Sequence, residues 1–103
     1  MKKEKTKGKK MNTIWRYDVN LGINRIDMPV GAKVLSLQAK ANQGTMWALV
    51  NAQAHRETRM FLVIPTGGFV PEGATFLGTY QMIADDGFIF VAHVFEFVQP
   101  MSS

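Results

Sequence analysis

Turn-forming residues divide this chain into short segments, and their spacing limits the possible folds more than any other feature. Clusters of glycine, proline, asparagine and aspartate recur roughly every 8–12 residues between apolar runs. No segment between them carries an apolar period that predicts a helix longer than about one turn. The pattern predicts an all-β fold of about six or seven antiparallel strands, arranged as a small sandwich or barrel.

Three segments show strand character in their apolar pattern. Thr13–Val19 places Trp15 and Tyr17 on one face, which we predict to be the core side. Lys33–Lys40 fits a strand better than a helix, which is the alternative that its apolar spacing leaves open. Phe88–Val98 is the longest predicted strand, and it is apolar on both faces.

The middle of the chain, residues 44–64, is expected to organise the fold. Two apolar runs, Thr45–Val50 and Met60–Ile64, flank the polar stretch Asn51–Arg59. This outline predicts a β-hairpin whose arms lie at the centre of the fold, because both faces of each arm are apolar. We interpret the polar stretch as a partner-facing loop, and its candidate binding residues are His55, Arg56, Glu57 and Arg59.

Several glycines have predicted structural roles. Gly44 follows Ala41-Asn42-Gln43, and we expect it to take a positive φ in a hairpin turn. Gly78 lies within a predicted strand, which indicates a bulge or a close backbone approach. Asp85-Asp86-Gly87 is typical of a tight turn between two strands.

Three apolar residues, Phe69, Val70 and Met28, lie outside the regular strand pattern. The segment Thr66–Gly73 predicts a long loop, and we expect its Phe69 and Val70 to pack on the core. The alternative is an exposed contact patch, which makes Phe69 a further candidate for partner binding. Met28, directly before Pro29, is expected at the surface because the proline should end its strand.

The positive charge of the chain is concentrated at its start. Residues 1–10 hold six lysines and one glutamate, a net charge of +5, whereas residues 11–103 sum to −1. This composition predicts a disordered basic tail at 1–10, a single β domain at 11–99 and a short C-terminal tail at 100–103. Phosphate contacts by such a tail would be independent of base sequence and sensitive to salt. The candidate phosphate-contacting residues are Lys2, Lys3, Lys5, Lys7, Lys9 and Lys10.

The residues available for catalysis are few. The chain has no cysteine and two histidines, and it has no glycine-serine elbow for an acyl-enzyme nucleophile. His93, on an apolar strand, is expected to be a core or rim residue with a backbone partner. We therefore predict a non-enzymatic protein without a metal or another cofactor. No apolar run approaches the length of about 20 residues that a membrane span needs, so we expect no membrane contact.

Five stretches of the chain form a recognisable series. They are MNTIWRYD from Met11, IDMPVGAKVLSLQ from Ile26, WALVN from Trp47, FLGTYQ from Phe76 and VAHVFE from Val91. Together they resemble a family of short, uncharacterised proteins from bacteriophages, prophages and their bacterial hosts. The resemblance covers about residues 11–97 in order, and it departs from the usual pattern at Asn51, where aspartate is common, and in the basic leader. It implies a small phage-type accessory protein in bacterial cytoplasm, and it carries no binding or catalytic residues over to this chain.

These observations lead to one main functional hypothesis and two alternatives. The main one is a protein that acts by binding a host or phage protein, with inhibition of a host factor as one form of this role. The alternatives are a nucleic-acid accessory protein that uses the lysine-rich tail, and a small-ligand or nucleotide binder with a pocket at the Thr66–Gly73 loop. Homo-oligomers are also expected, because strands that are apolar on both faces offer more apolar surface than one small sandwich needs.

Overall fold

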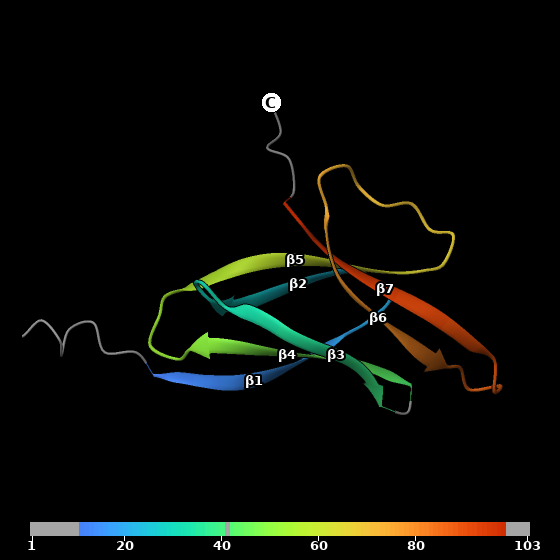
Figure 1. Ribbon diagram of the computed structural model, residues 1–103, viewed down its shortest axis with the longest axis horizontal. Helices are drawn as coiled ribbons and strands as arrows, with labels where there is room; N and C mark the ends of the chain where they lie inside the picture. Colours follow the sequence, from blue (N-terminus) through green and yellow to red (C-terminus); the bar gives the residue numbers. More distant parts are fainter. Residues whose placement is uncertain (1–10, 41, 99–103) are drawn as a thin grey trace, which may run out of the picture.

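The computed structural model describes residues 11–40 and 42–98, and within them the chain forms seven strands (Figure 1). The six predicted tail lysines and residues 100–103 lie outside the described residues. Among the described residues, no helix has the length and apolarity that crossing a membrane requires. The strands are β1 (Asn12–Val19), β2 (Gly22–Pro29), β3 (Lys33–Lys40), β4 (Gln43–Asn51), β5 (Arg56–Pro65), β6 (Thr75–Ile83) and β7 (Ile89–Phe97).

The strands form two sheets that face each other. The three-stranded sheet has the order β1-β4-β3, and the four-stranded sheet has the order β2-β5-β7-β6. Every pairing is antiparallel, and Figure 1 shows β2 and β5 of the larger sheet above β1 and β4 of the smaller one. The predicted all-β antiparallel class is confirmed, and of its two forms the described residues adopt the sandwich and close no barrel. Lys33–Lys40 is a strand, as predicted.

The predicted hairpin at the centre of the chain is wrong. β4 pairs with β1 and β3, whereas β5 pairs with β2 and β7, so the two arms lie in different sheets. Residues 52–55 carry the chain from one layer to the other. Two apolar runs around a polar stretch occur both in a hairpin and in a crossing between layers. The pattern does not specify which strands pair. The strands that are apolar on both faces do lie inside the sheets: β4, β5 and β7 are the three strands that are not at a sheet edge.

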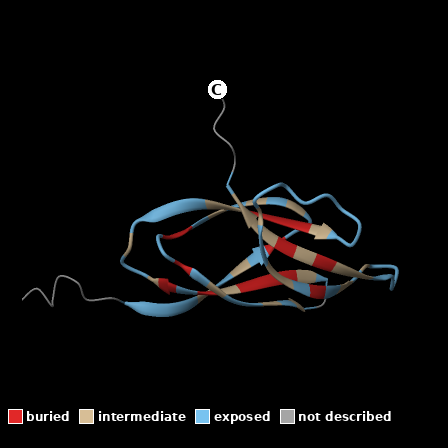
Figure 2. Cartoon of the chain, turned by 45° about the horizontal axis from the view of Figure 1, so that its top comes forward, coloured by how far each residue is buried: buried red, intermediate tan, exposed pale blue. Residues whose placement is uncertain are grey.

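The core lies between the sheets, and strands of both layers contribute its buried residues (Figure 2). Trp15 and Tyr17 pack against it, as their alternation predicts. Met28 was expected at the surface but is completely buried. Its strand does not end early: β2 runs through Pro29, and the alternation of the strand turns Met28 inward. The largest fully buried side chains are Phe61, Met28, Met46, Val19, Val50, Val63 and Val94.

Glycines allow close approach between the layers. Gly44 does not take the predicted positive φ; it lies within β4, where an added Cβ would lie 2.6 Å from Cζ of Tyr80 in the opposite sheet. Gly78 sits at the predicted bulge in β6, where a Cβ would lie 2.7 Å from Cδ1 of Leu37. Gly87, with a φ of 86°, forms the predicted tight turn before β7.

Candidate functional site

The outer face of the four-stranded sheet carries a continuous row of apolar side chains. Ile23 on β2 lies opposite Leu62 on β5, Leu62 lies opposite Phe95 on β7, and Phe95 lies opposite Phe76 on β6. All four point away from the core, because they alternate with residues that face the other sheet. We call these four residues the apolar row; it crosses the full width of the sheet.

The apolar row is covered at its centre and open at both ends. Leu62 is only 9% exposed, whereas Ile23 is 55% and Phe76 is 56% exposed. The Phe76 and Phe95 rings meet edge to face with their centroids 5.5 Å apart. Exposed apolar side chains in a continuous patch are typical of a surface that contacts another protein.

Two further rows of side chains border the apolar row. On one side, Arg25 lies opposite Met60, and Met60 lies opposite Phe97. On the other side, the His93 ring contacts two threonine hydroxyls. Its Nε2 lies 2.8 Å from Oγ1 of Thr66 and its Nδ1 lies 3.0 Å from Oγ1 of Thr79. His93 therefore sits on the outer face with side-chain partners, rather than with the backbone partner expected from the sequence.

A long loop rises beside this face. Residues 66–74 lead from the end of β5 past β7 to the start of β6, and they form the wide loop above β7 in Figure 1. Phe69 is 95% exposed and Val70 is 46% exposed. The expectation that both pack on the core is wrong: the chain turns at Gly67, which has a φ of 97°, and both side chains after it stay exposed. The alternative, an exposed contact patch, agrees with this placement.

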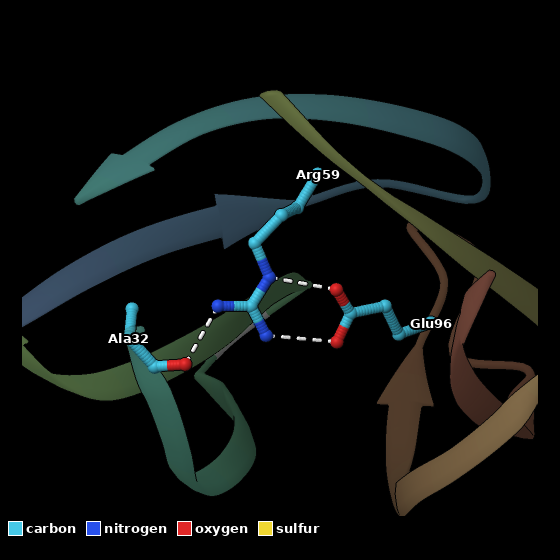
Figure 3. A network of polar contacts seen from close by, with 3 residues as sticks. All are labelled: Ala32, Arg59 and Glu96. Carbon is cyan, nitrogen blue, oxygen red and sulfur yellow. Dashed lines mark hydrogen bonds and ion pairs between the residues drawn. The ribbon is translucent and has the colours of Figure 1, made fainter. Parts of the chain in front are cut away.

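An ion pair closes one end of the sandwich. Arg59 of β5 donates from Nε to one carboxylate oxygen of Glu96 at 2.7 Å, and from Nη2 to the other at 2.8 Å (Figure 3). Nη1 of Arg59 donates to the carbonyl oxygen of Ala32 at 2.6 Å. The hydrogen bond to Glu96 raises the pKa of the guanidinium above its usual value. Arg59 thus joins β5, β7 and the β2–β3 connection.

The predicted partner-facing residues of the central segment differ in their surroundings. His55 lies in the crossing between the layers, and its carbonyl oxygen accepts a 2.7 Å hydrogen bond from the amide of Val30. Arg56, Glu57 and Arg59 belong to β5 rather than to a loop. The Arg56 guanidinium lies 5.1 Å from the ring centroid of Trp15, so it packs across the layers. The structure brings these residues to one end of the sandwich, and His55, Arg56 and Glu57 are exposed there.

Two cavities open beside the ion pair. The larger has a volume of about 530 Å³ and lies where the outer face meets the end of the sandwich. The smaller, of about 350 Å³, touches the end of the 66–74 loop. Both are lined by Glu96 and Phe97. No group of three or more metal-ligating side chains occurs in the part of the chain that the structure describes. The cavities extend the outer face and offer room for a side chain of a partner.

Burial of two tyrosines should make the folded state less stable at alkaline pH. Burial raises the pKa of Tyr17 and Tyr80 above 10.0, and for Tyr17 the charges of Arg56 and Arg59 partly oppose the effect. The unfolded chain therefore releases these protons at a lower pH than the folded chain. Stability that is present below pH 10.0 should fall as the pH rises through the raised pKa values.

Urea unfolding at a series of pH values would measure this dependence. We expect the Tyr17→Phe and Tyr80→Phe double variant to lose less stability than the wild type between neutral and alkaline pH. Tyr17→Phe also removes a hydroxyl that is buried without a hydrogen-bond partner among the described residues. If the free energy of unfolding fell equally with pH in the two proteins, the alkaline loss of stability would not come from these tyrosines.

Comparison with known proteins identifies a family. A family model described as a domain of unknown function, DUF7352, matches residues 11–102. No curated protein and no solved structure matches the chain. The match covers all seven strands, and therefore the outer face, the ion pair and both cavities.

Proposed function

We propose that this chain, which belongs to the DUF7352 family, is a non-enzymatic protein that acts by binding another protein through the outer face of its four-stranded sheet. The observation that carries the proposal is the apolar row, which is exposed at Ile23 and Phe76. The loop that holds Phe69 adds a projecting aromatic side chain beside it. Aromatic anchors on an apolar patch with a polar border are typical of protein interfaces.

We further propose a phage-type accessory role in the cytoplasm of a bacterial host, in which binding inhibits a host factor. This part rests on the resemblance of residues 11–97 to short phage and prophage proteins. The absence of cysteine suits a reducing compartment. The exposed residues His55, Arg56 and Glu57 lie at the end of the same sandwich, where they would border a partner seated on the outer face.

A pair of matched isoleucine substitutions tests the proposed face. Ile23 and Ile14 lie on edge strands of opposite sheets and are 55% and 56% exposed. We expect Ile23→Ser to weaken capture of a partner from host lysate at least about tenfold, because it places a hydroxyl in the apolar row. Ile14→Ser should leave capture unchanged. Equal behaviour of the two variants would argue against the outer face as the binding surface.

A second copy of this chain is one partner whose chemistry fits the apolar row. Light scattering of the purified protein would measure its mass. A dimer that Ile23→Ser dissociates and Ile14→Ser preserves would place the self-contact on this face. A monomeric mass at high concentration would leave a different protein as the partner.

A further inference from the structure

The outer face of the three-stranded sheet differs in chemistry from the apolar row. At its centre, Trp47 of β4 lies opposite Arg16 on β1 and opposite Ser36 on β3. Trp47 points outward because its neighbours Met46 and Ala48 are completely buried, and its indole is partly exposed. The centre of this face therefore combines an aromatic ring with a cation and a hydroxyl.

Both polar and apolar side chains neighbour this tryptophan along the strands. Leu49 of β4 lies opposite Lys33 on β3 and opposite Ile14 on β1, and Thr45 lies opposite Gln38 on β3. Lys40, at the end of β3, is also exposed. Hydrogen-bond donors and positive charges thus lie on the strands at both sides of the ring, with Arg16 on β1 and with Lys33, Gln38 and Lys40 on β3.

Charge is divided unequally between the two layers. Within the described residues, the strands of the three-stranded sheet carry three basic side chains and one acidic side chain. The rest of the described chain carries three basic and six acidic side chains. Residues 1–10, with their charge of +5, precede β1 of the basic layer in sequence. The basic layer has Arg16, Lys33 and Lys40 against Asp18; the other residues are Arg25, Arg56 and Arg59 against Asp27, Glu57, Glu72, Asp85, Asp86 and Glu96.

We propose that the outer face of the three-stranded sheet binds single-stranded nucleic acid, with Trp47 stacking on a base and the basic side chains contacting phosphates. Every base has a flat apolar face, so one exposed aromatic ring binds it without sequence preference. A duplex keeps its bases stacked inside and offers Trp47 no partner. The basic side chains of the layer, Arg16, Lys33 and Lys40, supply the attraction to phosphate. This face is independent of the apolar row, so the two proposals stand separately.

Matched arginine substitutions in the full chain test the charge contribution. Arg16 and Arg25 are both exposed residues of edge strands, and they lie in opposite layers. A fluorescently labelled oligothymidylate of about 12 nucleotides would serve as the probe in an anisotropy titration at low salt. We expect Arg16→Gln to weaken binding about three- to tenfold, and Arg25→Gln to change it less than about twofold. Equal losses would overturn the assignment to this face.

Two tryptophan variants test stacking. Trp47→Phe keeps an aromatic ring and should retain affinity within about threefold, whereas Trp47→Leu should lose about tenfold. Both are apolar replacements, and unchanged thermal unfolding would show that the sheet stays intact. Equal affinity of the two folded variants would overturn the role of Trp47.

Two further measurements test which ligand the face prefers and how much residues 1–10 contribute to binding. A duplex of the same length should bind at least about fivefold more weakly than the single strand; equal binding of the duplex, or of heparin, overturns the proposal. Changing the six tail lysines to glutamine should weaken binding and reduce its salt dependence, while the difference between Arg16→Gln and Arg25→Gln persists. If that difference disappears in this background, the tail alone binds and the sheet face does not.

Discussion

Replacing Glu96 with alanine is expected to lower the free energy of unfolding by about 2–3 kcal/mol. The Arg59 and Glu96 side chains are 17% and 25% exposed, so their ion pair is largely shielded from water. The change removes two charge-assisted hydrogen bonds and leaves the guanidinium with the carbonyl oxygen of Ala32. The loss should exceed that of an exposed pair, because water replaces the missing carboxylate only in part. Urea unfolding followed by circular dichroism would measure it.

Glu57→Ala is the matched control for this prediction. Glu57 is exposed on the same strand as Arg59, and its charge helps to raise the pKa of Arg59. We expect Glu57→Ala to cost less than about 0.5 kcal/mol, since exposed charges interact weakly. The apolar double variant Arg59→Met, Glu96→Leu should recover most of the stability that Glu96→Ala loses. A loss for Glu96→Ala no larger than for Glu57→Ala would contradict a structural role of the pair.

The sequence could not predict this ion pair, because its members lie 37 positions apart. Arg59 meets Glu96 only through the register that sets Phe61 of β5 opposite Glu96 of β7. In the sequence, Arg59 ends a polar stretch and looks like a loop residue. The structure instead places it on the inner side of β5, on the same face as buried Phe61 two residues later.

The strands themselves could be predicted, because their signals are local. Alternation identified the core side of Thr13–Val19, and glycine and aspartate marked the turn before β7. Pairing is not local: any apolar strand can lie beside another, so the partners of β4 and β5 had to come from the structure. The apolar row illustrates the consequence, since its four residues come from four strands and meet only after the sheet order is known.

Gly44→Ala is expected to destabilise the protein by about 2 kcal/mol, although strand propensity alone predicts the opposite sign. Alanine normally gains roughly 0.5–1 kcal/mol over glycine within a strand, because glycine loses more chain entropy on folding. Here the added methyl group would lie 2.6 Å from Cζ of Tyr80 and still closer to its hydroxyl. The tyrosine is 7% exposed, so the ring has little free space to move into.

A double-mutant cycle with Tyr80→Leu tests whether this contact is the cause. Leucine lacks the distal ring atoms and the hydroxyl that the methyl group would strike. We therefore expect Gly44→Ala to cost less than about 0.5 kcal/mol in the Tyr80→Leu background, which gives a coupling energy of at least about 1 kcal/mol. Additive losses would show that Gly44 is needed for its backbone rather than for the approach of the two sheets. Because Gly44 takes no positive φ, the steric contact with Tyr80 is the physical reason for glycine at this position.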